Sequence, residues 1–209
     1  MVIAWLAHVM QNVELAPLPA PWKRARLHRF DRTCFVKVLL NEETVQRGLC
    51  TLASDIEQVY RDQPLTIVGL MTGSIVLLAD LIRLLKMPLR VGVLQTSSYR
   101  NSTSRQGLQI NSELMLDISE RDVLVIDDIF DTGHTLNEVL QRLRQLHPHS
   151  IRSAVLLRKS GRQEVELQPD FVVFEIPDQF VVGYGLDYCD QFRNLPFVAA
   201  LEPADIGSL

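Results

Sequence analysis

The feature that most constrains the fold is an alternation of short apolar runs with helix-like segments between residues 34 and 157. Each run has four to seven residues, the length of a buried strand, and most are followed by a segment with helical periodicity. The predicted strands are 34–40, 65–70, 89–94, 123–126, 151–157, 171–174 and 180–186, and the predicted helices are 41–62, 74–85 and 135–146. This pattern is typical of an α/β fold in which a mostly parallel sheet is flanked by helices.

The first predicted helix has a clear start signal. Asn41 can cap its N-terminus, and Glu42 and Glu43 place negative charge in its first turn. Its inner face is expected to consist of Val45, Leu49, Leu52, Ile56 and Val59.

Composition excludes several classes of protein. The chain has 209 residues, 47% of them hydrophobic, and a net charge of −4, so it is neither a disordered chain nor one with a global positive field for nucleic acid or anionic membranes. Its sequence contains no apolar stretch of 18 residues that could span a bilayer, and Val2–Met10 lacks the basic start of a secretory signal. The three cysteines, Cys34, Cys50 and Cys189, have no disulfide or zinc-ribbon spacing. We expect a cytoplasmic protein without membrane or nucleic-acid partners.

Residues 1–30 are expected to form an N-terminal extension, either lying on the body or partly disordered. Pro17, Pro19 and Pro21 exclude a continuous helix. The basic run Lys23–Arg29 is interpreted as a solvated surface, with an anion or RNA contact as the alternative. The remaining residues, 31–209, are expected to form one domain.

The most informative segment for chemistry is Val123–Thr135. Four aliphatic residues predict a doubly buried strand, and Asp127, Asp128 and Asp131 follow at its carboxyl end, where parallel sheets gather ligands. Like charges about 4 Å apart repel by roughly 4 kcal/mol at an effective dielectric of 20. The acids therefore call for a bridging cation or a polyhydroxylated ligand, and Mg²⁺ suits oxygen ligands and diphosphates.

The residues after these acids predict an anion site. An amphipathic helix starts at Thr132, Gly133, His134 and Thr135, and its first N–H groups and its dipole attract negative charge. Because Gly133 has no side chain, an anion can approach the backbone closely. The alternative is an ordinary capped helix. That interpretation explains one Asp and one Thr, but not three Asp beside Thr-Gly-His-Thr.

Residues 123–135 resemble the phosphoribosyl pyrophosphate (PRPP) signature of the type I phosphoribosyltransferases. The later segments Leu156–Ser160 and Phe171–Tyr188 are similar to motifs of the hypoxanthine-guanine members of that family. The resemblance covers roughly residues 34–201. It implies the family's fold, with a small hood formed by the N-terminal region and the chain after residue 159.

The resemblance also implies a role for each site residue. Asp127 and Asp128 would hold the ribose hydroxyls directly or through Mg²⁺, and Asp131 would be the general base near N7 of the purine. The 5-phosphate would lie on Asp131, Thr132, Gly133, His134 and Thr135. Lys159 would donate to the 6-oxygen of the base, although an ordinary exposed lysine is the alternative.

Further implied contacts come from the C-terminal third. Phe180 would stack on the base, Val181 would offer its backbone to the base edge, Asp187 would bind a second Mg²⁺ and Arg193 would contact pyrophosphate. Core packing is the alternative for Phe180.

Two loops complete the implied site. In the family, the loop matching Met71, Thr72 and Gly73 binds pyrophosphate through backbone amides, one of them exposed by a cis peptide before a basic residue. Thr72 occupies that basic position here, which departs from the pattern. Ser98 and Tyr99 lie in a polar stretch, 96–112, that resembles the loop closing over the family's active site and excluding water. A surface loop without function is the alternative.

The expected activity is transfer of 5-phosphoribose from PRPP to N9 of hypoxanthine or guanine, giving IMP or GMP and pyrophosphate. A same-fold regulator that binds nucleotide and RNA or DNA, or an enzyme preferring xanthine, is the alternative. The resemblance further implies a homodimer or homotetramer.

Overall fold

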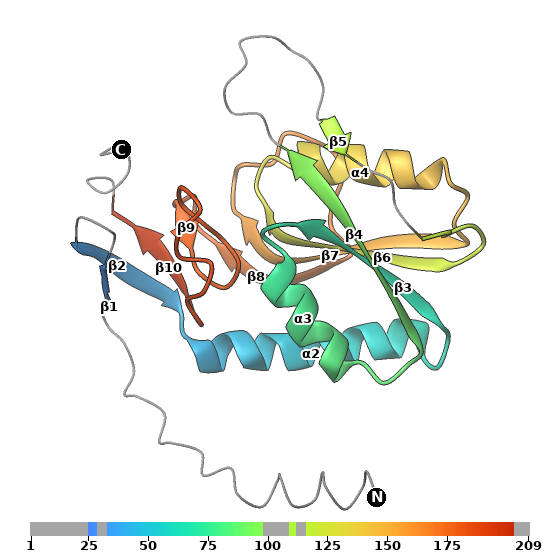
Figure 1. Cartoon of the computed structure of the whole chain (residues 1–209), viewed down its shortest axis with the longest axis horizontal. Helices are drawn as coiled ribbons and strands as arrows, with labels where there is room; N and C mark the ends of the chain where they lie inside the picture. The colour runs from blue at the N-terminus through green and yellow to red at the C-terminus, as the bar shows by residue number, and fades with distance from the viewer. Residues whose placement is uncertain (1–24, 29–32, 98–108, 112–115, 203–209) are drawn as a thin grey trace, which may run out of the picture.

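The computed structural model describes residues 25–28, 33–97, 109–111 and 116–202 (Figure 1). The helices are α2 (Glu42–Tyr60), α3 (Ile75–Leu84) and α4 (His134–Arg144). The strands are β1 (Ala25–His28), β2 (Thr33–Leu40), β3 (Leu65–Met71), β4 (Leu89–Ser97), β5 (Gln109–Asn111), β6 (Asp122–Phe130), β7 (Ser150–Lys159), β8 (Phe171–Ile176), β9 (Val181–Val182) and β10 (Val198–Leu201). No helix among these residues is long and apolar enough to cross a membrane.

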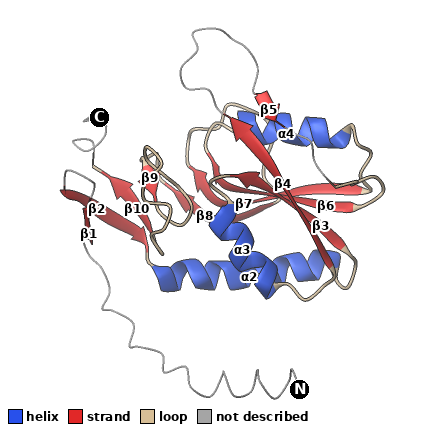
Figure 2. Ribbon diagram, in the orientation of Figure 1, coloured by secondary structure: helices blue, strands red, loops and turns tan. Residues whose placement is uncertain are grey.

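The main sheet has six strands in the order β5-β4-β3-β6-β7-β8. Strands β4, β3, β6, β7 and β8 run parallel, and β5 pairs antiparallel with the end of β4. Helices α2 and α3 lie on one face of this sheet and α4 lies on the other, as Figure 2 shows. The predicted α/β fold with a mostly parallel, helix-flanked sheet is therefore confirmed.

Side chains of the central strands alternate between two cores. In β6, Leu124 and Ile126 pack with α2 and α3, whereas Val123 and Val125 pack with α4. Because all four are fully buried, the strand is covered on both faces, as its run of aliphatic residues predicts. This packing on both faces holds the carboxyl end of β6, which stays paired with β7 through Phe130, in place.

Helix α2 begins as predicted but its inner face differs at the C-terminal end. The Asn41 side chain accepts a hydrogen bond of 2.8 Å from the backbone N–H of Thr44. The predicted inner face includes Val59, but Val59 is 44% exposed and Tyr60 is buried instead. The expected positions repeat every seven residues, whereas a straight α-helix with 3.6 residues per turn drifts about 20° per heptad, so the buried stripe moves to Tyr60.

A second, antiparallel sheet has the order β1-β2-β10-β9 and lies beside the α2 N-terminus (Figure 1). It joins the beginning of the described chain to its end, since β2 pairs with β10. Residues 25–28, within the expected N-terminal extension, form its edge strand β1. Val181 and Val198 pack from this sheet into the main core, which anchors it to the domain.

The strand predictions differ from the structure in two ways: one strand is shorter than predicted, and three strands, β1, β5 and β10, were not predicted. The strand predicted over 180–186 is limited to β9, because the chain turns at Gly183 and Gly185, both at positive φ. Strand β10 was not predicted, since Val-Ala-Ala-Leu is short and its partners are far away in sequence. Most of the predicted arm, 96–112, lies outside the described residues, although β5 belongs to it.

Candidate active site

The acidic end of β6 continues as strand through Asp127 and Asp128. Asp127 is 9% exposed, and its Oδ1 accepts a hydrogen bond of 3.0 Å from the backbone N–H of Asp128. Burial, together with the neighbouring charge of Asp128, raises the pKa of Asp127 well above its ordinary value. Two adjacent carboxylates are thus held at the carboxyl edge of the sheet with few protein partners.

The loop after β3 lies against this pair. The peptide bond between Met71 and Thr72 is cis, as the resemblance implies. A Cβ placed on Gly73 would lie only 1.9 Å from Asp128 Oδ2, so the glycine backbone contacts that carboxylate directly. The Ser74 hydroxyl donates to the carbonyl of Leu70 over 2.6 Å and ties the loop to its strand. The backbone of this loop therefore faces the acidic strand end.

The N-terminus of α4 is open. Its N-cap residue, Gly133, has φ 87° and ψ −4°, and no side chain caps the helix. A Cβ at Gly133 would lie 2.5 Å from Val165 Cγ2 and 2.6 Å from Phe130 Cζ, so the tight left-handed turn requires glycine. The uncapped N–H groups of the first turn form an anion-binding position beside the acids.

His134 contributes its backbone to this turn, while its ring points elsewhere. The ring Nε2 lies 3.0 Å from Glu164 Oε2, and both side chains are more than half exposed. The backbone N–H of Glu164 donates to the Thr132 carbonyl over 3.0 Å. The segment after β7 thus supports the helix start from outside.

Asp131 belongs to a cluster of alternating charges. Lys159 Nζ lies 3.1 Å from Asp131 Oδ2, and Arg162 Nε lies 3.0 Å from Asp131 Oδ1. Asp178 Oδ1 lies 3.6 Å from Lys159 Nζ and 3.7 Å from Arg162 Nε, which closes the four-residue ring. Burial raises the pKa of Asp131, but the hydrogen bonds and charges of Arg162 and Lys159 outweigh it, and the net pKa is lowered. Asp131 is therefore an ionised carboxylate at neutral pH.

Arg162 and Asp178 were not predicted. A usable signal is that both follow the carboxyl ends of neighbouring parallel strands, since Lys159 at the end of β7 pairs with Ile176 at the end of β8. Residues that follow such strand ends lie close together whatever their sequence separation.

Arg193 links the C-terminal turn to the same edge. It donates to the Gly185 carbonyl over 2.8 Å and pairs with Asp187 Oδ1 at 2.9 Å. A Cβ at Gly185 would lie 2.1 Å from the Gly73 carbonyl oxygen, so this turn packs closely on the loop after β3. Burial raises the pKa of Asp128, and the charge of Arg193 opposes part of that rise.

Val181 is the first residue of β9, the edge strand of the second sheet, and Phe180 directly precedes it. The Phe180 ring packs edge-on against Tyr188, with ring centroids 5.2 Å apart and an interplanar angle of 77°. Leu201 N–H donates to the Phe180 carbonyl, and Val181 stands opposite Ala200. Since bonded and non-bonded pairs alternate in an antiparallel ladder, the N–H and C=O of Val181 point to the free edge of β9.

The structure thus brings Gly73 against Asp128, the Gly185 turn with Arg193 against Gly73, and Lys159 against Asp131. Phe180 and Val181 instead lie at the start of β9 in the second sheet. Ser98 and Tyr99 lie outside the described residues. Within the part of the chain that the structure describes, no three His, Cys, Asp or Glu side chains are grouped to hold a metal by themselves.

Comparison with known proteins identifies the family. The family model described as a phosphoribosyl transferase domain matches residues 36–189. The chain is 38% identical over 169 residues to the hypoxanthine-guanine phosphoribosyltransferase of Bacillus subtilis, covering 80% of this chain and 94% of that protein. It is 40% identical to the enzyme of the same name from Aquifex aeolicus, covering 80% and 95%.

A solved structure agrees with the sequence comparison. The crystal structure of a hypoxanthine-guanine phosphoribosyltransferase from Bacillus anthracis, with a HEPES molecule in its active site, superposes with a TM-score of 0.76 at 33% identity. The match covers 79% of this chain and 98% of that chain. With the fold, the acidic strand end and the open helix start in place, the chain belongs to the phosphoribosyltransferase family.

Proposed function

We propose that the protein transfers 5-phosphoribose from PRPP to N9 of hypoxanthine or guanine, giving IMP or GMP and pyrophosphate in purine salvage. The observation that carries this proposal is the contact of Asp128 with the Gly73 backbone, beside the uncapped start of α4. An acidic pair and a backbone anion site on adjacent segments match a sugar that carries phosphates at both ends. The names of the relatives favour this enzyme over a nucleic-acid-binding regulator.

In this proposal the two ends of PRPP bind to different segments. Asp131, Thr132, Gly133, His134 and Thr135 hold the 5-phosphate, chiefly through backbone N–H groups. The diphosphate lies on the loop of Met71, Thr72 and Gly73 and is met by the guanidinium of Arg193. The close packing of Gly185 on Gly73 keeps Arg193 near that loop.

The donor set fits Mg²⁺. Asp127, Asp128 and Asp187 offer only oxygen ligands, and Mg²⁺ is commonly held by one or two carboxylates with substrate phosphates and water completing its shell. Asp127 and Asp128 would hold one ion or the ribose hydroxyls. Asp187 would hold a second ion, and its ion pair with Arg193 would then be weakened. When bound, Mg²⁺ neutralises the diphosphate and makes it a better leaving group.

Base selection follows from donor chemistry. Lys159 carries only hydrogen-bond donors, so it pairs with the 6-oxygen of hypoxanthine or guanine and not with the 6-amino group of adenine. The outward N–H and C=O of Val181 complete recognition at the base edge. Phe180, oriented by Tyr188, stacks on the base, a contact of about 1–3 kcal/mol by analogy with other base-stacking aromatics.

Proton handling falls to Asp131. Its carboxylate lies beside the Lys159 ammonium. N7 and the 6-oxygen share one edge of the purine, so Asp131 can accept from N7–H while Lys159 donates to the 6-oxygen. As N9 attacks the ribose carbon, Asp131 receives the proton of N7. The loop carrying Ser98 and Tyr99 is proposed to exclude water during this step.

Several expectations stay predictions within this proposal. They are the division into an extension, 1–30, and a domain, 31–209, with a hood; a cytoplasmic location; and a homodimer or homotetramer.

A nucleotide-formation assay tests the proposed activity. The purified protein is incubated with PRPP, Mg²⁺ and hypoxanthine, guanine, xanthine or adenine in turn. We expect IMP and GMP, no AMP, and loss of product when EDTA is added. Product from xanthine alone would replace the proposed base preference, and no product from any purine would refute the enzyme.

A further inference from the structure

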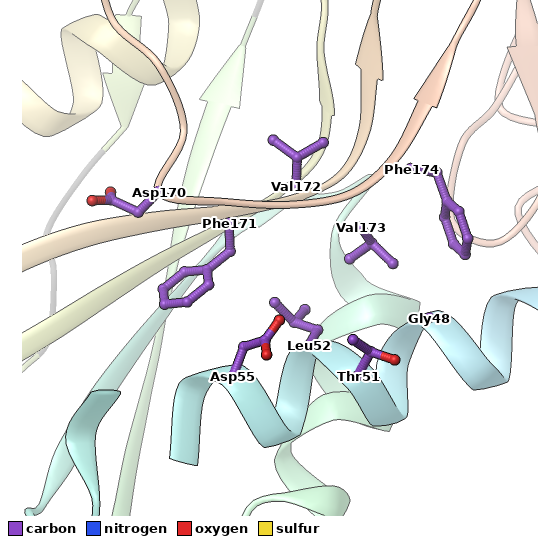
Figure 3. A pocket seen from close by; sticks show the side chains of 9 residues that line it. All are labelled: Gly48, Thr51, Leu52, Asp55, Asp170, Phe171, Val172, Val173 and Phe174. Atoms are coloured by element: carbon purple, nitrogen blue, oxygen red, sulfur yellow. The ribbon is translucent and has the colours of Figure 1, made fainter. Parts of the chain in front are cut away.

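Helices α2 and α3 cover the same face of the main sheet but contact different neighbours. Helix α2 lies along β8, and Figure 3 shows Phe171 and Val173 directed from that strand toward the helix. A Cβ on Gly48 would lie 2.4 Å from Phe174 Cζ, so the two elements touch. Helix α3 instead contacts a turn, residues 183–186, that follows β9 of the second sheet. This contact includes a buried tyrosine that the proposed reaction does not use.

That tyrosine, Tyr184, lies within the turn of residues 183–186. It is 3% exposed and belongs to the core cluster that also contains Leu77 and Leu81 of α3. Its φ is 50°, a left-handed conformation that is costly for a residue with a Cβ. Because so little of Tyr184 is exposed, it cannot contact a substrate. Its strained backbone indicates that the surrounding contacts hold it in place.

The side chain of Tyr184 ends on an acidic residue of α3. Its hydroxyl donates to Asp80 Oδ2 over 2.6 Å, a length typical of a hydrogen bond to a charged acceptor. Burial, together with the hydrogen bond and charge of Asp80, raises the pKa of Tyr184, so the hydroxyl stays protonated and remains a donor. The other oxygen of Asp80, Oδ1, pairs with Arg83, whose side chain is mostly exposed. Since exposed pairs contribute little, Tyr184 is the stronger partner of Asp80.

The turn meets the beginning of α3 at two points. Gly185 packs on the carbonyl of Gly73, and a Cβ added to Gly185 would also lie 3.7 Å from Val76 Cβ. Asp80, which accepts from Tyr184, comes four residues after Val76 and therefore lies on the same face of α3. The turn is thus joined to the loop before α3 by close packing, and to the helix itself by a hydrogen bond.

Arg193 is held by the same turn. The N–H of Tyr184 donates to the Leu195 carbonyl over 2.8 Å, and the N–H of Gly185 donates to the carbonyl of Arg193 over 2.9 Å. The guanidinium of Arg193 donates in return to the Gly185 carbonyl. Because this carbonyl belongs to the residue after Tyr184, a shift of Tyr184 moves the acceptor that orients the guanidinium.

We propose that Tyr184 and Asp80 are positioning residues, and that their hydrogen bond fixes Arg193 against the loop that holds the diphosphate of PRPP. This inference rests on the proposed function, which gives Arg193 the diphosphate contact. The pair touches no reacting atom and acts through the Gly185 carbonyl. It affects the binding of PRPP and pyrophosphate more than that of the base, because β9, which carries Val181, is held separately by β10.

Removing the hydroxyl alone tests the pair. Tyr184→Phe keeps the buried ring and should raise the KM for PRPP about five- to twentyfold, in the range expected for one hydrogen bond to a charged group. The KM for hypoxanthine and kcat should each change less than about twofold. Arg83→Gln removes the other partner of Asp80 and is the matched control, with all three constants unchanged. An unchanged KM for PRPP in Tyr184→Phe, or an equal rise in both KM values, would overturn the proposal.

Two variants of Asp80 separate positioning from folding. Asp80→Asn keeps an acceptor oxygen for the Tyr184 hydroxyl and should stay close to the wild-type KM for PRPP. Asp80→Leu removes the acceptor and should match Tyr184→Phe. Circular dichroism under the assay conditions checks that each variant is folded. A similar rise in KM for Asp80→Asn and Asp80→Leu would show that the hydrogen bond is not responsible, which also overturns the proposal.

A double variant tests the route through Arg193. Arg193→Gln should itself raise the KM for PRPP. Adding Tyr184→Phe to it should raise that KM by less than about twofold more, because the group to be positioned is already gone. Effects of the two changes that simply multiply would show that Tyr184 does not act through Arg193.

Binding of pyrophosphate measures the same link without turnover. In isothermal titration calorimetry with Mg²⁺ and pyrophosphate, the Kd should be about five- to twentyfold higher for Tyr184→Phe than for the wild type and Arg83→Gln. Equal affinities of the three proteins, or no binding by any of them, would overturn this inference. Failure of the proposed function is a different result, namely no nucleotide formed by the wild type from any purine.

Discussion

Helices α2 and α4 each follow a strand closely, but their N-termini are capped in opposite ways. At α2, the Asn41 side chain accepts from Thr44 N–H, and Glu42 and Glu43 supply negative charge to the first turn. At α4, Gly133 provides no side chain, and the first turn contains no acidic residue. At α2, a side chain of the protein accepts a hydrogen bond from a backbone N–H group of the first turn. At α4, the N–H groups of the first turn have no side-chain acceptor and can bind an external anion.

Their neighbourhoods differ in the same sense. Glu43 lies on the surface and pairs with Arg47 at 3.3 Å, with both side chains more than 70% exposed. Asp131 precedes α4 and is held by Lys159 and Arg162 instead of by the helix. The start of α2 is capped by a side chain of the protein, whereas the start of α4 is uncapped and follows a carboxylate that is held by two basic side chains.

Replacing the acid beside each helix gives the largest expected contrast. Asp131→Asn should lower kcat about 10²–10⁴-fold, because an amide cannot take the proton of the base, without weakening PRPP binding. Glu43→Gln removes a surface pair worth under about 1 kcal/mol and should leave kcat unchanged. Steady-state kinetics and PRPP titration measure both. Near-normal kcat in Asp131→Asn would remove Asp131 from the mechanism.

Replacing the glycine at the α4 start should strain the fold. Gly133→Ala places a Cβ at φ 87° within 2.6 Å of Phe130 and 2.5 Å of Val165, so we expect a loss of about 2–5 kcal/mol in the free energy of unfolding. Gly161 is the matched control, since it has φ 75° but a Cβ added there would have no neighbour within 4 Å. Gly161→Ala should cost only about 1–2 kcal/mol. Equal losses in urea unfolding would show that the contacts of Gly133 are not restrictive.

Removing the α2 cap should affect stability alone. Asn41→Ala deletes the acceptor of the Thr44 N–H and should cost about 1 kcal/mol in the free energy of unfolding. Because the Asn41 side chain contacts only its own helix start and carries no proposed substrate contact, kcat/KM should stay at the wild-type value. A fall in kcat/KM under conditions where the variant is folded would contradict this separation of roles.

The smallest effect is expected at the loop of Met71, Thr72 and Gly73, which is proposed to hold the diphosphate. Thr72→Lys restores a charge at the position where the family has a basic residue, and should lower the KM for PRPP about two- to fivefold, or roughly 0.4–1 kcal/mol. Thr72→Gln adds length without charge and serves as the control. If both variants bind PRPP alike, charge at this position has no role in holding the diphosphate.

The sequence predicted the features that depend on neighbouring residues, and it missed those that depend on packing between residues far apart in the chain. The Asn41 cap and the strand-to-helix run of 123–135 depend on neighbouring residues, so the sequence predicts them well. The prediction for Val59 is wrong because a seven-residue spacing was extended along a straight helix. Strand β10 and the ring of Asp131, Lys159, Arg162 and Asp178 depend on pairings across many residues, which no local pattern records.

The most direct test of the account is an NMR titration of backbone amides with PRPP and Mg²⁺. We predict large, saturable shifts for the N–H groups of residues 132–135 at the start of α4, and unchanged signals for residues 42–44 at the start of α2. Shifts of similar size at both helices, or none at 132–135 at saturation, would contradict the assignment of the open α4 start as the phosphate site.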